Sequence, residues 1–231
     1  MDKQNYQKEL DAILSSITKA KTFQKGKKPS LLLHACCAPC SSYVLEYLLN
    51  FFKITIFYYN PNIHPEAEYN RRLTELKNFL PVFSANKTEK ISLIEEPYNT
   101  QDFFDATNVQ NEPDLKTEAE KGERCQRCYF FRMKKAYQFA CQNNFDWFTT
   151  TLSISPFKDA QKINTIGKSL ELENTKNFQT NTKFLTSDFK KKGGFKRSLE
   201  LSKEFGLYRQ DYCGCIFSKQ NMNKTGKQDD N

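Results

Sequence analysis

The sequence predicts an α/β domain with a mainly parallel sheet that is flanked by helices. Short apolar or β-branched runs alternate along the chain with segments whose apolar residues recur at helical spacing, and this alternation is typical of parallel sheets. The first run, 30–34, reads Ser-Leu-Leu-Leu-His, which suits a strand that is buried on both faces. Cysteines follow at once, at the carboxyl end of the strand, where such sheets place their sites.

The first half of the chain is expected to contain three strands and three helices. Leu10, Leu14 and Ile17 share one face of a helix, and Ser41 with Ser42 can cap the helix that follows the cysteines. The second strand is rich in β-branched and aromatic residues, and Asn-Pro-Asn stops it. The expected elements are, in order, a helix over 6–18, a strand over 30–34, a helix over 41–52, a strand over 53–59, a helix over 65–80 and a strand over 90–95.

The second half repeats this alternation after a polar stretch. Met133, Ala136 and Ala140 recur at helical spacing, and a glycine closes the last helix. A basic, glycine-containing loop precedes that helix. The expected elements are a helix over 129–143, a strand over 146–151, a loop over 152–157, a helix over 159–173, a short strand at 184–185 and a helix over 195–205.

These elements are expected to form a single domain over 30–218. With 231 residues the chain is long enough to bury a real core. Residues 1–29 are interpreted as an N-terminal extension that ends in a basic linker, and 219–231 as a disordered polar tail. Residues 98–124 are polar and irregular, with helical patches, and are interpreted as an insertion that delivers the cysteines after it.

Composition limits the partners and the compartment. A formal net charge of +8 fits either an ordinary basic protein or a polyanionic partner, with nucleic acid first among these. The sequence has neither a secretory signal nor an apolar run of the ~18 residues that span a membrane. A cytoplasmic location is therefore expected, with no membrane partner. In a reducing compartment, clustered cysteines indicate metal binding or redox chemistry rather than structural disulfides.

The most informative pattern is that seven of the eight cysteines fall into three tight groups. Seven thiolates exceed the four that one tetrahedral zinc requires. The number indicates an iron–sulfur cluster with further metal or redox chemistry beside it. The groups are Cys36-Cys37-Ala-Pro-Cys40, Cys125-Gln-Arg-Cys128 and Cys213-Gly-Cys215.

The first two groups each leave more than one use open. Cys36 and Cys37 are adjacent on a strand-to-helix bend, so they cannot easily point the same way and could serve two neighbouring metals. The helix start lowers thiol pKa values there; buried free cysteines in a small apolar turn would be the structural explanation. The pair at 125–128 opens a helix and fits half a zinc site, half a cluster site or a dithiol pair.

The last group is equally open, whereas the cysteine and histidines outside the groups are expected to be structural. A glycine between Cys213 and Cys215 permits a sharp bend, so the pair can chelate one ion, divide between two metals or form a strained disulfide. Cys141 lies on the apolar face of its helix and is expected in the core. His34 and His64 are expected to pack or hydrogen-bond rather than bind metal.

Several motifs follow one another over about 30–218. They are Leu31-Leu-Leu-His-Ala-Cys-Cys-Ala-Pro-Cys40, Tyr58-Tyr-Asn-Pro-Asn-Ile-His-Pro65, Arg124-Cys-Gln-Arg-Cys-Tyr129, Thr150-Thr-Leu152 with Ser155-Pro-Phe-Lys158, Asp188-Phe-Lys-Lys-Lys192 and Tyr208-Arg-Gln-Asp-Tyr-Cys-Gly-Cys215. Taken in this order, they resemble the QueH family of epoxyqueuosine reductases. The resemblance implies an oxidoreductase of tRNA processing that completes queuosine biosynthesis by reducing the epoxide of epoxyqueuosine to the alkene of queuosine, without cobalamin. It also implies an adenine nucleotide α-hydrolase-like fold, in which the first cysteine group replaces the loop that binds ATP phosphates in that superfamily.

The resemblance further implies a [4Fe-4S] cluster beside a mononuclear iron. Cys125 and Cys128 are the expected cluster ligands, completed by one cysteine from 36–37 and one from 213–215, while the remaining thiols face the second iron. Some members of the family carry Asp where this chain has Cys40, so the ligands of the second iron are where this sequence departs from the pattern. The implied partners are tRNA that carries epoxyqueuosine and an unidentified electron donor.

Polar residues near these motifs are candidates for substrate contact. Basic residues of the 190–197 region could follow a phosphate backbone, and polar residues beside the last cysteine group could contact the modified nucleoside. Each of them could instead have a structural role or point to solvent. The candidates are Lys158, Lys190, Lys191, Arg197, Tyr208, Arg209 and Asp211.

Two different functions would explain part of the pattern. A zinc-stabilised RNA-binding module without redox activity explains the charge and the cysteine groups but leaves three thiols beyond one four-cysteine site. A dithiol oxidoreductase that uses Cys213 and Cys215 leaves the cysteines of 36–40 unexplained.

Overall fold

In the part of the chain that the structure describes, five strands form one sheet in which every pair is parallel, and this confirms the predicted fold class. The computed structural model describes residues 4–85, 87, 89–177 and 181–219. The strand order is β3-β2-β1-β4-β5. The strands are β1 (Ser30–His34), β2 (Lys53–Tyr58), β3 (Ser92–Glu95), β4 (Trp147–Thr150) and β5 (Lys183–Phe184).

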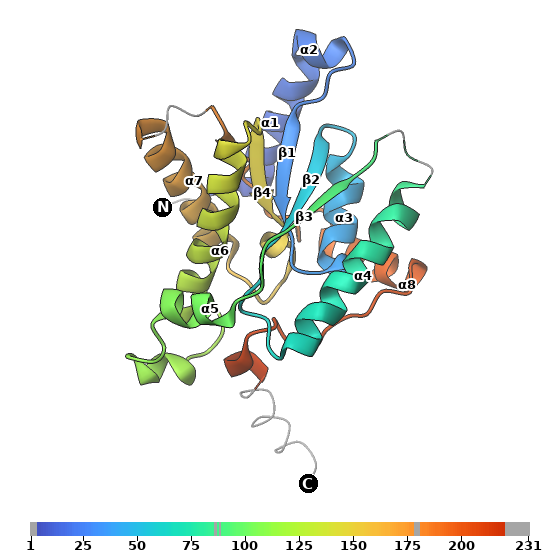
Figure 1. Cartoon of the computed structure of the whole chain (residues 1–231). Helices are drawn as coiled ribbons and strands as arrows, with labels where there is room; N and C mark the ends of the chain where they lie inside the picture. Colours follow the sequence, from blue (N-terminus) through green and yellow to red (C-terminus); the bar gives the residue numbers. More distant parts are fainter. Residues whose placement is uncertain (1–3, 86, 88, 178–180, 220–231) are drawn as a thin grey trace.

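Helices cover both faces of the sheet (Figure 1). One face carries α1 (Tyr6–Lys19), α3 (Ala38–Leu48), α4 (Glu66–Ser84) and α8 (Gly194–Glu204), and the other carries α6 (Glu123–Gln142) and α7 (Ala160–Asn177). The shorter elements are α2 (Lys21–Gln24), α5 (Thr100–Thr107) and the 3-10 turns η1 (Pro113–Lys116) and η2 (Thr151–Ile154).

The central strand β1 is buried on both faces, as its apolar run predicts. Leu31 and Leu33 pack in the core beneath α1, α3 and α4. Leu32 points to the opposite face and packs with α6 and α7, because successive side chains of a strand alternate.

The N-terminal helix α1 contributes to the same core. Leu10, Leu14 and Ile17 are buried in the cluster that contains Leu31 and Leu33. The Asn5 side chain caps the helix by accepting a hydrogen bond from the Lys8 backbone N–H at 3.1 Å. The N-terminal extension is thus part of the packed domain as far as the described residues go.

Two helices begin earlier than the sequence predicts. Helix α3 starts at Ala38 with Cys37 as its N-cap, so the prediction that Ser41 and Ser42 cap it was wrong. Their hydroxyls instead donate to carbonyls inside the first turns. Helix α6 starts six residues before 129, because the Glu118 carboxylate, outside the helix, accepts hydrogen bonds from the first backbone N–H groups at 2.6 and 2.8 Å. The expected tail lies outside the described residues, apart from Lys219.

The strand order places a crevice between β1 and β4. The chain runs outward from β1 to β2 and β3, and β4 then pairs on the other side of β1, with His34 opposite Thr150. The loops after two such strands diverge and leave room for a ligand. The loop before α3 and the segment after α8 meet at this end of the sheet, low in Figure 1.

None of the described helices is both long and apolar enough to cross a membrane.

Candidate metal centre

The cysteines after β1 form a tight cluster, called here the three-cysteine group. The sulfurs of Cys36, Cys37 and Cys40 all lie within 4.8 Å of one another, and the first two are 3.8 Å apart. Cys37 is extended at the N-cap of α3 and Cys40 lies one turn further on, which brings the thiols together. Two thiolates on one tetrahedral ion with bonds of about 2.3 Å are about 3.8 Å apart. The group fits a single metal ion, and the expectation that the adjacent Cys36 and Cys37 would point different ways is wrong, because their sulfurs come together.

A second set, the four-cysteine group, surrounds a small cavity nearby. Cys125 and Cys128 come from the first turns of α6, and Cys213 and Cys215 come from the segment after α8. Within the described part of the chain, no three of these sulfurs come within 4.8 Å of one another. A four-iron cube holds its thiolates at its corners, farther apart than the ligands of one ion. Cys213 and Cys215 lie close enough for a hydrogen bond between their thiols, but the four thiols surround the cavity without converging on one point, and such a set could hold a cluster.

A glycine makes the second half of the four-cysteine group possible. Gly214 has φ +101°, and a Cβ there would come within 2.8 Å of the Ile63 side chain. The Gly214 carbonyl accepts a hydrogen bond from the His64 backbone N–H at 2.8 Å. The Arg72 guanidinium donates to the carbonyls of Cys213 at 3.3 Å and Tyr212 at 3.2 Å. These bonds tie the turn to α4 and to the segment after β2.

Two cations lie close to both cysteine groups. Arg132 is only 2% exposed, and it donates to the Asn60 side chain at 2.6 Å and to the Cys128 sulfur at 3.9 Å. Lys158 lines the four-cysteine cavity and also the larger cavity beside it. Burial alone lowers the pKa of Lys158, but the thiols of Cys213, Cys36 and Cys40 outweigh burial and raise it. Both cations therefore stay charged among the sulfurs.

Each group contains one acidified thiol. Hydrogen bonds from Cys37 and Cys40, and the charges of Arg132 and Lys158, hold the pKa of Cys36 well below its ordinary value. A hydrogen bond from Cys215, and then the Lys158 charge, lower the pKa of Cys213 to about 5. Metals bind thiolates rather than thiols, so each group offers one thiolate to a metal, while hydrogen bonds from neighbouring thiols or burial raise the pKa of the other five thiols.

Buried polar atoms near these groups also lack partners. Among the described residues, Asn62 Oδ1, Arg132 Nε and Gln210 Oε1 are buried without a hydrogen bond, and all three side chains line the cavities of the two groups. Such atoms are rare in folded proteins and indicate an absent ion, ligand or water. Together with the donor set, they fit a metal centre.

A larger cavity of about 530 Å³ opens beside the three-cysteine group. Its wall contains sulfur-bearing residues from both groups and charged residues that the sequence singled out. The volume is within the range of small-molecule sites. The lining includes Cys36, Cys40, Cys213, Lys158, Arg209 and Asp211.

The structure separates the candidate substrate residues into two sets. Lys158, Arg209 and Asp211 line the large cavity. Arg209 is fixed there by a hydrogen bond to the Ser202 hydroxyl at 3.0 Å, and its guanidinium lies 5.7 Å from the centre of the Phe195 ring.

The other four candidates lie outside the lining of that cavity. Lys190 pairs with Asp188 at 2.6 Å, and Lys191 is exposed. Arg197 makes two hydrogen bonds to Glu46, at 2.9 and 2.8 Å, which tie α8 to α3.

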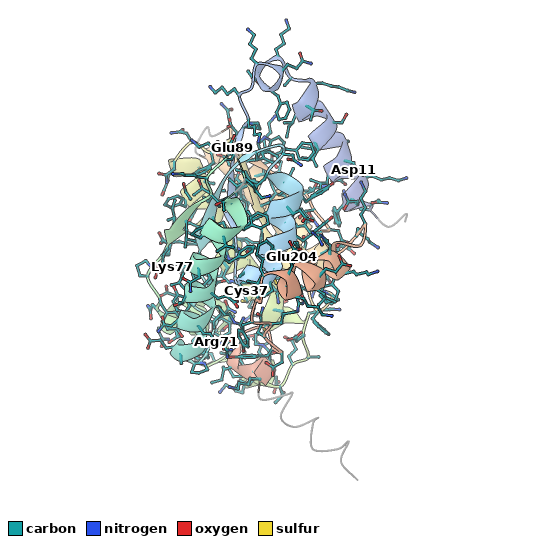
Figure 2. All side chains as sticks on the ribbon, turned by 90° about the vertical axis from the view of Figure 1, so that its right-hand side faces the viewer. Asp11, Cys37, Arg71, Lys77, Glu89 and Glu204 are labelled. Carbon is teal, nitrogen blue, oxygen red and sulfur yellow. The ribbon has the colours of Figure 1, made fainter. Side chains whose placement is uncertain are left out.

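Tyr208 faces a separate groove of about 690 Å³ along α4. The Arg71 guanidinium lies 3.3 Å above its ring. In Figure 2, Arg71 lies on α4, whereas Cys37 lies further inside, near the start of α3.

Three further residues belong to this site in addition to those predicted from the sequence. Arg132 follows Cys128 by four residues, and that helical spacing puts both on one face. Gln210 donates to the Cys37 sulfur at 3.0 Å, and Phe157 lines both cavities. The last two fall within motifs that carry the family resemblance, and that is the signal by which they could have been found.

Structural roles are confirmed for two of the other candidates. Cys141 packs against the core beneath α6 and α7. His34 is buried between Thr150 Oγ1 at 2.9 Å and the Tyr59 carbonyl at 3.3 Å, and burial lowers its pKa to about 3. A neutral imidazole there connects β1 to β4 and β2.

Comparison with known proteins identifies a family. The family model described as epoxyqueuosine reductase QueH matches residues 31–221. Proteins named epoxyqueuosine reductase QueH are 40% identical over 200 residues in Streptococcus pyogenes, covering 86% of this chain and 74% of the relative. In Staphylococcus epidermidis the identity is 36% over 214 residues, covering 93% and 84%. In Thermotoga maritima it is 34% over 190 residues, covering 82% and 90%.

Proposed function

We propose that this chain, which belongs to the epoxyqueuosine reductase QueH family, reduces the epoxide of epoxyqueuosine in tRNA to the alkene of queuosine. The reaction consumes two electrons and two protons and releases the epoxide oxygen as water. One observation carries the proposal: a cavity of about 530 Å³ has Cys36 and Cys40 of one group and Cys213 of the other in its wall. A substrate in that cavity would lie beside both sets of thiols.

We assign the four-cysteine group to a [4Fe-4S] cluster and the three-cysteine group to a mononuclear iron. The first group surrounds a cavity without any three of its sulfurs lying within 4.8 Å of one another, whereas all three sulfurs of the second do; both observations support this assignment. It differs from the mixed ligand set that the family resemblance implies, in which a cysteine from 36–37 joins the cluster. When bound, the cluster would supply single electrons and the iron a Lewis acid, so that no cobalamin is needed.

The chain's own residues would bind and orient the nucleoside. The Lys158 ammonium is held beside the sulfurs of both groups and can donate a hydrogen bond to the epoxide oxygen as it acquires charge. Arg209 stands at the same cavity with its guanidinium fixed by Ser202, where it can pair with a phosphate. Asp211 is exposed in the cavity wall and can accept hydrogen bonds from hydroxyl groups.

The remaining partners follow from the reaction. The substrate is tRNA, and the two electrons require a donor, which we expect to be a one-electron carrier. All eight cysteines are free, as suits a protein of the reducing cytoplasm.

The first test is anaerobic purification followed by iron, sulfide and zinc analysis and a visible spectrum. We expect about four to five irons and four sulfides per chain with a broad brown absorbance. Dithionite-reduced protein should then convert epoxyqueuosine to queuosine in tRNA. One or two zinc ions without sulfide, even after reconstitution with iron and sulfide, would instead identify a zinc-stabilised RNA-binding module.

A further inference from the structure

Phe157 is the most exposed aromatic side chain among the described residues. It is 65% exposed, and among the other phenylalanines that the structure describes only Phe130, at 36%, is exposed. An exposed phenylalanine forgoes the stabilisation that burial would give it. The residue is not at a random surface position, because it lines both the large cavity and the four-cysteine cavity.

The backbone presents this ring in a fixed place. Pro156 and Phe157 form the centre of a turn in which the Lys158 backbone N–H donates to the Ser155 carbonyl at 3.2 Å. The Phe157 N–H donates to the Ser155 hydroxyl at 3.3 Å. Directly after the turn, the Asp159 carboxylate caps α7 by accepting from two backbone N–H groups at 2.9 and 3.2 Å. These bonds fix the backbone that carries the ring, so only the rotation of the side chain is left to be lost when a ligand stacks on it.

The surroundings of Phe157 combine aromatic and basic side chains around one opening. The adjacent Lys158 carries a positive charge, and the Arg209 guanidinium lies against Phe195 on the same cavity. The chain as a whole has a formal net charge of +8. Rigid aromatic faces interleaved with cations are the arrangement by which proteins hold unpaired nucleotides.

We propose that Phe157 is a stacking platform for the nucleobase next to the modified one, when the modified nucleoside occupies the large cavity. The inference rests on the proposed function, since it takes tRNA as the substrate. Bases of a loop can splay out without opening a duplex. One face of the ring then supports the neighbouring base, while Lys158 contacts the group inside the cavity.

Two other roles would also leave Phe157 at this position. The ring could shield the four-cysteine cavity from solvent, because it lines that cavity as well. Alternatively, it could anchor an electron-donor protein. The three roles require different things of the side chain: a flat ring for stacking, apolar bulk for shielding, and contact with a protein for docking.

The test measures binding of an unmodified anticodon stem-loop RNA by fluorescence anisotropy at one fixed salt concentration, using the metal-loaded protein. Phe157→Ala and Phe157→Leu should raise the Kd by about 5- to 150-fold, the range expected for loss of one base–aromatic stack. Phe157→Trp should stay within about threefold of the parent protein, because it keeps a flat ring. Iron and sulfide content should be unchanged in all three variants.

Phe130→Ala is the matched control. Phe130 is also an exposed phenylalanine, at 36%, but it lies on α6 beside Lys134 and lines neither cavity. Its removal should leave the Kd unchanged. The iron and sulfide analysis also shows whether each Phe157 variant is folded and loaded before its Kd is compared.

Three results would overturn the stacking role. Parent-like binding by Phe157→Leu would show that apolar bulk suffices. Loss of iron from Phe157→Ala with unchanged RNA binding would identify a shield. Unchanged RNA binding with slower turnover only when a protein donor replaces dithionite would identify a docking site for that donor. If the parent protein binds no RNA, the proposal that tRNA is the substrate is overturned. The three results above overturn only the stacking role.

Discussion

The two cysteine groups share a cavity but are built in opposite ways. The three-cysteine group comes from five consecutive residues that run from the loop after β1 into the first turn of α3, so the end of the sheet itself positions it. The four-cysteine group joins the start of α6 to a segment near the end of the chain, and it depends on packing between distant parts. The comparison indicates that the first site is a property of local backbone geometry and the second a property of the whole fold.

Their hydrogen-bond partners differ in the same way. A neutral donor, the Gln210 amide, contacts Cys37 at 3.0 Å. A buried cation, Arg132, contacts Cys128 at 3.9 Å. A positive charge beside a cluster stabilises the reduced, more negative state, whereas a neutral donor mainly orients its thiolate. The side chains that donate directly to the two groups therefore differ in charge, although the charge of Arg132 also reaches Cys36.

Removing one cysteine from each group should affect different parts of the metal content: the cluster in one variant and the single iron in the other. Cys128→Ser should lose most of the iron, the sulfide and the brown colour, and epoxide reduction should fall below detection, because a cluster corner is left without a thiolate. Cys40→Ser should lose at most one iron and keep the sulfide and colour. Anaerobic iron and sulfide analysis with a visible spectrum checks both variants.

The control for this pair is Cys141→Ser. Cys141 packs against the core beneath α6 and α7 and belongs to neither group, so its metal content should match the parent protein. Equal loss of sulfide from the Cys40 and Cys128 variants would show that the two groups hold one joint cluster, which neither ligand set predicts, because both leave Cys40 to the second iron.

Replacing Arg132 should change the cluster without removing it. Arg132→Gln deletes a buried positive charge but keeps a hydrogen-bond donor, so the cluster's midpoint potential should fall and activity should drop by about 10- to 100-fold. Spectroelectrochemical titration measures the potential directly. Lys134→Gln removes an exposed charge from the same helix and should leave the potential in place. A parent-like potential in the Arg132 variant would assign its role to packing alone.

Replacing Gln210 should act on the three-cysteine group only. Gln210→Leu keeps the approximate size of the side chain but removes the hydrogen-bond donor to Cys37. Retention of the single iron should weaken by about tenfold, which is the lower end of the effect of removing a hydrogen-bond partner of a metal ligand. Competition with an iron chelator measures retention. Sulfide content should not change. Faster loss of sulfide than of one iron would mean that Gln210 supports the cluster instead.

Much of the fold can be predicted from the sequence because its signals are local. The apolar run at 30–34 gives β1 with both ends correct, and the spacing of Leu10, Leu14 and Ile17 gives α1. The start of α6 cannot be predicted in this way, because Glu118 caps it from outside the helix. A propensity pattern does not report such a bond.

The candidate site likewise has residues that the sequence predicts and residues that it does not. The sequence places Cys36, Cys37 and Cys40 within five residues and so indicates a site, but it does not predict that the Cys36 and Cys37 side chains point the same way, as the structure shows by placing all three sulfurs within 4.8 Å of one another. The sequence cannot reveal that Arg197 pairs with Glu46 on α3 and lies outside the wall of the large cavity. Nor can it reveal that Arg209 lines that cavity. Packing between distant segments decides which residues pair, and a single sequence does not show that packing.

One part of the four-cysteine group does depend on local geometry, namely the backbone of Gly214. The test of this residue expects the smallest change in metal content. Gly214→Ala should be strained by φ +101° and by a contact of 2.8 Å with Ile63, so it should lose about 2–4 kcal/mol of stability and some sulfide. Gly206→Ala shares a positive φ, +61°, but meets nothing within 4 Å; it should cost about 1–2 kcal/mol and leave the metal content intact. Thermal unfolding and sulfide analysis compare the two, and equal effects would show that backbone strain alone, rather than the close approach at Ile63, shapes the Cys213–Cys215 turn.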